Sequence, residues 1–158
     1  MLQVQKQQKG DLLVVSLKGG LDETVDLNLE IGNTTPPRID FVMKEVVRIN
    51  SQGIKVWLRY LQSLQGKVST IRLLDCSAAV VEAMNSISNF ASGAIVESVY
   101  VPFFCKDCRK EFLGLFRVGD IKKLALKIPD LNCPSCQGGA SFDDVEKEYF
   151  YFITRSGK

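Results

Sequence analysis

The amino-acid sequence predicts an α/β protein with a largely parallel sheet, followed by a small module built around cysteines. Between residues 11 and 104, short apolar runs alternate with segments of helical apolar spacing. Such alternation implies crossover connections, which join parallel strands. From residue 105 onward, four cysteines stand in two C-x-x-C pairs. With 158 residues, 46% of them apolar, the chain can bury one ordinary core, or a core plus a small module.

Four apolar runs predict strands, because they are short and are bounded by turn-forming residues. The first run is closed by Gly19 and Gly20. The region 21–38 that follows ends in two prolines, so we expect mostly loop there, with one short strand around residues 27–31. The four predicted strands cover residues 12–17, 39–43, 68–74 and 94–103.

Two segments predict helices. In the first, apolar residues recur at helical spacing from Ile54 to Leu64, and Gly66 marks the end of the last turn. In the second, Ser77 is a natural N-cap for a helix whose apolar positions run from Val80 to Phe90.

A change of character at Cys105 predicts two domains, over residues 1–104 and 105–158. No flexible linker separates them, so we expect them to pack together. In the tail, Ser141-x-x-Asp144 resembles a capping box, and Phe142 begins a series of apolar residues at helical spacing. The later motif "YFYFI" instead favours a strand. We expect a helix whose aromatic side packs on the body of the protein.

The two C-x-x-C pairs carry the strongest chemical signal. They are formed by Cys105, Cys108, Cys133 and Cys136. Two residues between thiolates let both sulfurs of a tight turn point at one ion, and two such turns give the four-sulfur site that zinc prefers. The 24 residues between the pairs exceed the usual spacing slightly. An iron–sulfur cluster and a redox pair are the alternatives. Four protein ligands would close the coordination shell, so we expect one structural Zn²⁺ without a catalytic role.

The composition narrows the classes of function. The chain has no histidine, which removes the commonest general base, and its net charge is only +2. Residues 106–127 hold seven basic and three acidic residues, but an acidic stretch from Asp143 to Glu148 opposes them. We therefore expect no enzyme activity and keep nucleic-acid binding as the alternative function. The N-terminus lacks a secretory signal and no apolar run could span a bilayer, so we expect a cytoplasmic protein without membrane association.

The stretch "VVRINSQGIKVWL" places a small polar loop between an apolar run and a helix. Asn50 or Ser51 can cap the helix that starts near Gly53. The same position suits modification, because a phosphoryl group on Ser51 would sit at a helix N-terminus, where free amides and the dipole favour an anion. The residues alone leave both interpretations open.

Residues 11 to about 101 resemble the STAS domain, the fold of bacterial anti-sigma-factor antagonists. The resemblance is carried by "LLVVSLKGGLD", by "VVRINSQGIKVWLRYLQ" and by "VSTIRLLDCSAAVVEAM". It implies a small mixed sheet with helices mainly on one face. It also implies a regulatory, non-enzymatic role, in which the loop of Asn50, Ser51, Gln52 and Gly53 docks on a partner serine kinase or anti-sigma factor, and in which Ser51 is phosphorylated. Asn50 and Gln52 replace the Asp and Ser of the family motif. The four-cysteine module is not part of the basic family domain, and oligomers are compatible with this role.

Overall fold

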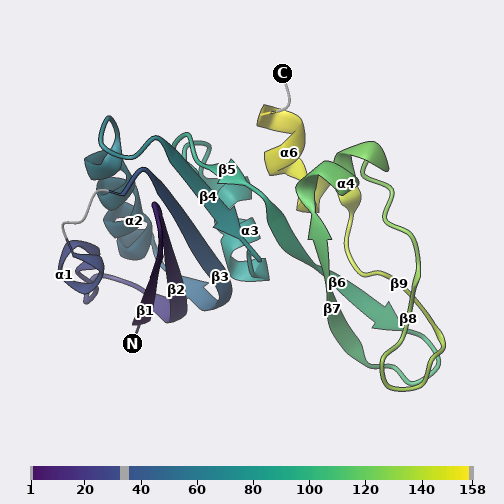
Figure 1. The fold of residues 1–158 in the computed structure, drawn as a ribbon. Coiled ribbons are helices and arrows are strands. Elements are labelled where there is room, and N and C mark those ends of the chain that lie inside the picture. Colours follow the sequence, from purple (N-terminus) through teal and green to yellow (C-terminus); the bar gives the residue numbers. More distant parts are fainter. Residues whose placement is uncertain (1, 33–35, 157–158) are drawn as a thin grey trace.

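The computed structural model describes residues 2–32 and 36–156, which form a mixed α/β unit and a second, smaller antiparallel sheet (Figure 1). The predicted fold class is confirmed. The first sheet has the strand order β1-β2-β3-β4-β5. Its strands are β1 (Gln3–Lys9), β2 (Leu12–Leu21), β3 (Arg38–Ile49), β4 (Thr70–Leu74) and β5 (Ile95–Val96). Only β1 runs antiparallel to its neighbour, whereas β2 to β5 are parallel.

The helices of this unit are α1 (Leu27–Ile31), α2 (Ser51–Leu64) and α3 (Ala78–Ser86). Because the parallel strands follow one another in a single direction across the sheet, right-handed crossovers place these helices on one face. The alternation along β3 agrees, since Ile39, Phe41 and Met43 are fully buried. Phe41 meets the Trp57 ring of α2 edge-on, with centroids 5.1 Å apart. The core of the first unit therefore lies between the sheet and these helices.

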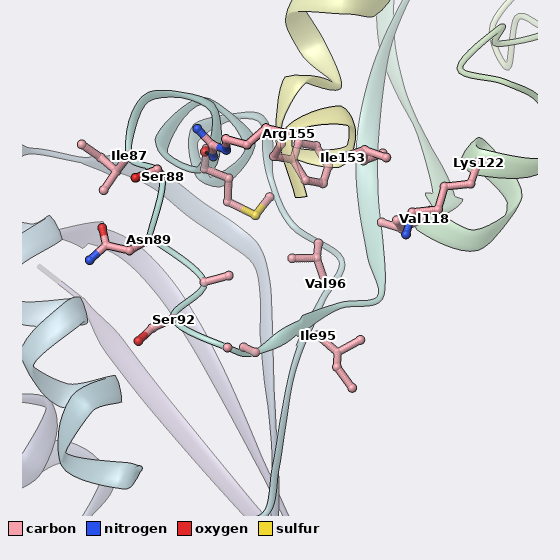
Figure 2. A pocket seen from close by; sticks show the side chains of 15 residues that line it. Ile87, Ser88, Asn89, Ser92, Ile95, Val96, Val118, Lys122, Ile153 and Arg155 are labelled. Carbon is pink, nitrogen blue, oxygen red and sulfur yellow. Dashed lines mark hydrogen bonds between the residues drawn. The ribbon is translucent and has the colours of Figure 1, made fainter. Parts of the chain in front are cut away.

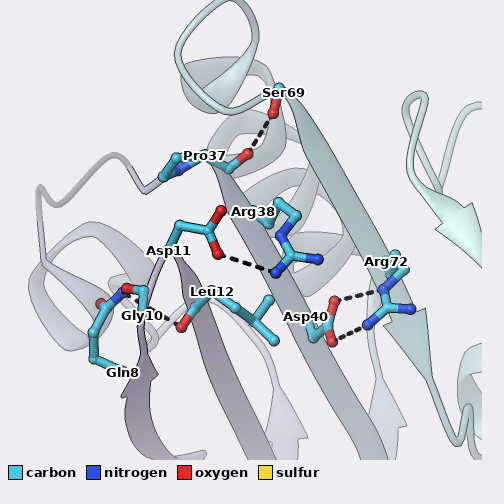
Figure 3. Close-up of polar contacts among 9 residues, drawn as sticks. All are labelled: Gln8, Gly10, Asp11, Leu12, Pro37, Arg38, Asp40, Ser69 and Arg72. Atoms are coloured by element: carbon cyan, nitrogen blue, oxygen red, sulfur yellow. Dashed lines mark hydrogen bonds and ion pairs between the residues drawn. The ribbon is translucent and has the colours of Figure 1, made fainter.

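The opposite face of the sheet carries several polar contacts between neighbouring segments (Figure 3). Arg72 of β4 forms a two-pronged hydrogen bond with Asp40 of β3, at 2.8 and 2.5 Å. This bond to a carboxylate raises the pKa of the Arg72 guanidinium above its usual value. Arg38 of β3 pairs with Asp11, just before β2, through a single contact of 3.0 Å. Arg38 and Asp40 alternate along β3 with the apolar Ile39 and Phe41, so these pairs lie on the face of the sheet away from the helices.

Two parts of the first unit differ from the sequence-based prediction. Residues 27–31 form helix α1 rather than a short strand, because the Asp26 side chain caps the helix by accepting from the Leu29 amide at 3.1 Å. Leu27 and Ile31 are four residues apart and both buried, which suits one helical face. The polar strand β1 was not predicted. It pairs with β2 across a tight turn in which Gly10 has a positive φ of 61°.

The predicted strand over residues 94–103 is in fact two strands in two different sheets. Its first part is β5, and its second part is β6 (Ser98–Cys105), which changes partners after Glu97. The second sheet has the order β7-β6-β9-β8, with β7 (Glu111–Arg117), β8 (Leu131–Asn132) and β9 (Gly139–Phe142), all antiparallel. Helix α4 (Val118–Lys123) follows β7.

The tail packs on the body, as predicted, but its helical part begins later than the capping-box motif indicates. Ser141 lies in β9, and the helical turns are α5 (Glu146–Tyr149) and α6 (Tyr151–Ser156). Phe150 is fully buried and stacks on the Phe142 ring at 5.6 Å. The Asn85 side chain at the end of α3 binds the tail backbone at two points, the Tyr149 carbonyl and the Phe152 amide. Among the described residues, none of the helices combines the length and apolar character that a membrane span requires.

Candidate metal centre and docking loop

The four cysteines of the two C-x-x-C pairs meet at one end of the second sheet. Their sulfur atoms all lie within 4.8 Å of one another. The Sγ atoms of Cys105 and Cys136 are 3.5 Å apart, and those of Cys108 and Cys133 are 3.6 Å apart. A disulfide would need about 2.05 Å, so these cysteines are free thiols. Cys105 and Cys133 are buried, whereas Cys136 is exposed, which places the cluster at the surface of the sheet.

Both C-x-x-C pairs adopt the same backbone turn. In the first, the Arg109 amide donates to the Cys105 carbonyl at 2.8 Å and the Cys105 amide donates to the Lys110 carbonyl at 3.0 Å. The second turn repeats these bonds at the matching positions, from Gln137 to Cys133 at 2.9 Å and from Cys133 to Gly138 at 2.7 Å.

Each turn also places one non-glycine residue in the left-handed region, Arg109 at φ 61° and Gln137 at φ 66°. Such φ values are uncommon outside glycine. Finding this conformation at the same position of both turns indicates that the two turns are equivalent halves of one site.

Backbone amides point at the sulfurs of the second turn. Ser135 donates to Cys133 Sγ and Gly138 donates to Cys136 Sγ, each at 3.4 Å. The amide of Cys136, together with that of Ser135, lowers the pKa of the Cys133 thiol to about 7. At Cys136 the largest single influence is the Gly138 amide, which lowers the pKa, but the hydrogen bonds with the other three cysteines and burial together outweigh it and raise that pKa to about 12. The four sulfurs therefore hydrogen-bond to one another in two pairs. A cation bound between them could take the place of the protons in these bonds.

The geometry fits a tetrahedral metal ion. Zn–S bonds of about 2.3 Å in a regular tetrahedron separate the sulfurs by about 3.8 Å. The observed contacts of 3.5 and 3.6 Å are close to this edge length. Four sulfur donors and no open position suit Zn²⁺, and they also suit tetrahedral iron. Cys76, the fifth cysteine, is a separate buried residue whose pKa burial raises to about 12.

The predicted docking loop, residues 50–53, connects β3 to α2. The helix cap is Asn50, whose Oδ1 accepts from the Gly53 amide at 2.8 Å. Ser51 is therefore the first helical residue rather than the cap. It is exposed, and within the described chain its hydroxyl has no hydrogen-bond partner. Gln52 is exposed as well.

The packing of β2 against α2 requires a glycine at position 53. A Cβ at this position would lie 1.9 Å from the Leu21 carbonyl oxygen and 2.5 Å from the Leu21 carbonyl carbon. The end of β2 therefore lies directly against the first turn of α2. Only glycine allows this close approach. The glycine of the N-S-x-G pattern is therefore required by packing, whereas Ser51 and Gln52 form the exposed polar part of the loop.

A hollow of about 360 Å³ lies beside the loop, between α1 and α2. It is lined by Glu23, Thr24, Val25, Asp26, Leu27, Asn28, Val56, Arg59 and Tyr60. Asn50 Nδ2 donates to Glu23 Oε2 at 3.4 Å, which joins the rim of this hollow to the loop. Sequence analysis did not single out these residues, because the segment before α1 carries no motif.

A larger pocket of about 490 Å³ lies where the tail approaches the segment after α3 (Figure 2). Its lining combines residues from Met84 to Val96 with Val118, Lys122 and the tail. The Arg155 guanidinium donates to the carbonyls of Met84 and Asn85, closing the end of α3. The charged side chains described in this lining are Lys122 and Arg155.

Comparisons with known proteins assign no family to the chain. No protein-family model matches its sequence, and no curated protein matches it significantly.

Proposed function

We propose that this protein is a non-enzymatic regulatory module that docks on a partner protein through residues 50–53 and carries one structural Zn²⁺ on its four clustered cysteines. The observation that carries the docking proposal is the exposed Ser51-Gln52 step at the start of α2. The observation that carries the zinc proposal is the convergence of four sulfurs within 4.8 Å. A cytoplasmic location fits free cysteines.

The zinc ion would close the two equivalent turns onto each other and so fix one end of the second sheet. We expect about one zinc per chain by elemental analysis of the purified protein. Cys133→Ser should lose the metal, whereas Cys76→Ala, which removes an equally buried thiol outside the cluster, should retain it. Visible absorbance with bound iron would identify the iron alternative. Metal-free, reduced protein that melts like the metal-loaded form would contradict the structural role.

The docking proposal rests on the resemblance of residues 11 to about 101 to the STAS domain. The mixed five-stranded sheet with helices on one face and the exposed strand–loop–helix step support this resemblance. The partner we propose is a serine kinase or an anti-sigma-factor-like regulator. Phosphorylation of Ser51 would add a charge of about −1.5 to −2 at the helix N-terminus. Glu23, which contacts Asn50, lies on the same surface, so this charge would change how the surface accepts a partner.

The test is affinity capture from extract of the source cells, read by mass spectrometry. Wild type and Ser51→Ala should capture the same kinase or regulator, and Ser51→Asp should lose it. Ser88→Asp is the matched control, because it adds the same charge at an exposed position outside a helix N-terminus. Capture that is equal for Ser51→Asp and Ser88→Asp would refute docking at this loop. If protein isolated from cells carries no phosphate on Ser51 under any growth condition, the proposed phosphorylation switch is refuted, whereas the docking proposal still stands.

Nucleic-acid binding is the second candidate function, favoured by the exposed cations Lys106, Arg109 and Lys110 on the first cysteine turn. It predicts binding to single- or double-stranded nucleic acid that weakens steeply with salt. A mobility-shift assay at low salt decides this point, since no shift there would rule out a phosphate-binding surface.

A further inference from the structure

The outer strand of the second sheet, β7, has an unpaired edge and an exposed apolar side. Within residues 2–32 and 36–156, β7 neighbours only β6 in the sheet order. Leu113 is 54% exposed and Leu115 is 50% exposed, although both lie in a regular strand. An apolar edge strand of this length is a template for pairing with another strand.

The hydrogen bonds of β6 determine which backbone groups of β7 are free. The Pro102 carbonyl accepts from Asp143, and the Tyr100 amide donates to Cys76, so both residues direct their backbone groups away from β7. Their partners in the ladder are Leu113 and Leu115. Because such pairs share no hydrogen bond, the amides and carbonyls of these two leucines point outward from the sheet.

The sequence of β7, "EFLGLFR", is a palindrome around Gly114 except at its ends, where the residues carry opposite charges. If a second copy pairs antiparallel about a two-fold axis through Gly114, Leu113 of one copy lies opposite Leu115 of the other. Glu111 then lies opposite Arg117, at both ends of the strand pair. In this register, the amides of one copy that point away from its β6 lie opposite the carbonyls of the other copy that do the same, along the whole strand.

We propose that two copies of this chain form a symmetric dimer by pairing their β7 strands about Gly114. The occupant is a second copy because the strand complements itself in charge, in apolar side chains and in backbone polarity, which an isologous contact requires. The half-buried Phe104, Pro102 and Tyr100 lie on the same side of the sheet as the two leucines and continue the apolar surface. One strand per copy makes an interface of less than about 1,200 Å², so the dimer is weak and depends on concentration.

Arg117 already has one partner within the chain, because its Nη2 lies 3.5 Å from Glu97 Oε1. The Arg117 side chain is 72% exposed, so this contact leaves it accessible to a second copy. Glu97→Gln removes the internal pair and keeps the charges of β7. It is therefore the control that separates the internal ion pair from the one between copies.

The experiment is sedimentation velocity of the zinc-loaded full chain from about 1 μM to about 1 mM. Wild type and Glu97→Gln should dimerise with rising concentration. Glu111→Arg alone and Arg117→Glu alone should each raise the dimer dissociation constant by about tenfold, because each places like charges opposite one another twice. The double variant Glu111→Arg/Arg117→Glu should restore wild-type dimerisation. Absence of a dimer at about 1 mM, or failure of the double variant to restore it while it stays folded, would overturn the proposal.

Amide hydrogen exchange of the wild-type protein provides a readout that needs no substitution. Exchange at Leu113 and Leu115 should slow as the concentration rises, whereas exchange at Gly114, whose amide faces β6, should stay constant. Exchange at the two leucines that is the same at all concentrations would show that any dimer uses another surface.

Discussion

Substituting Gly53 by alanine tests the close packing of β2 against α2. The new Cβ would meet the Leu21 carbonyl oxygen at 1.9 Å, whereas real Cβ contacts essentially never fall below 3.0 Å. The backbone of Leu21, which is 1% exposed, must therefore retreat by at least 1.1 Å. Overpacking of this kind costs about 3 kcal/mol, and the higher helix propensity of alanine returns about 1 kcal/mol. We expect a net loss of about 2 kcal/mol in the free energy of unfolding.

Urea unfolding followed by circular dichroism measures this loss. With a slope of about 2 kcal/mol per molar urea, the midpoint of Gly53→Ala should fall by about 1 M. The matched control is Gly119→Ala in the first turn of α4, where a Cβ meets nothing within 4 Å. This control should gain about 0.5 kcal/mol. If both variants gain stability equally, Leu21 does not lie against the helix and the explanation of Gly53 is wrong.

Two further predictions concern α2. Asn50→Ala should lower the free energy of unfolding by about 1 kcal/mol, because it removes the N-cap. Ser51→Ala should change it by less than about 0.5 kcal/mol. Equal losses for the two variants in urea unfolding would contradict the assignment of Asn50 as the cap. Tyr60→Phe should gain about 1 kcal/mol, because the buried Tyr60 hydroxyl has no partner within the described chain. Burial raises the pKa of Tyr60 from 10.0 to about 12, so wild type should lose stability as pH rises through this range, and Tyr60→Phe should lose less. A destabilised Tyr60→Phe would mean that the hydroxyl does have a partner.

The sequence predicted those elements whose signals are local. The apolar spacing of α2, the Ser77 cap of α3 and the cysteine spacing each specify a conformation within a few residues, and the structure contains all of them. The cap of α2 could not be assigned between Asn50 and Ser51, because either side chain can reach a free amide from adjacent positions.

The elements that were missed depend on distant partners. Strand β1 is polar on both sides, since it lies at the sheet edge, so its sequence shows no alternation. The split after Glu97 is invisible in "AIVESVYVPF" because both halves have high strand propensity and only their partners differ. Helix α1 could have been predicted from Asp26, because aspartate is a favoured N-cap residue. Its capping hydrogen bond outweighs the strand propensity of the apolar run that follows.

The tail links the four-cysteine cluster to α3, in addition to the direct backbone hydrogen bonds that join Cys76 to β6. Cys105 pairs with Ala140 between β6 and β9, and the chain continues from β9 into the tail. The tail then binds both polar groups of the Asn85 side chain, and Arg155 closes the end of α3. If the cluster holds the proposed zinc, we expect its loss to loosen β9 and, with it, the tail contacts at the end of α3.

Trp57 can report whether this connection carries stability. It is the only tryptophan, it is fully buried in the first unit, and its Nε1 donates to the Phe90 carbonyl just after α3 at 2.9 Å. We expect removal of zinc by a chelator to lower the thermal midpoint of Trp57 fluorescence by several degrees, and Cys133→Ser to do the same without a chelator. Cys76→Ala treated with chelator and then reloaded with zinc should recover its own untreated midpoint. An unchanged Trp57 midpoint after proven loss of the metal would mean that the two sheets unfold independently and that the tail contacts at Asn85 contribute little.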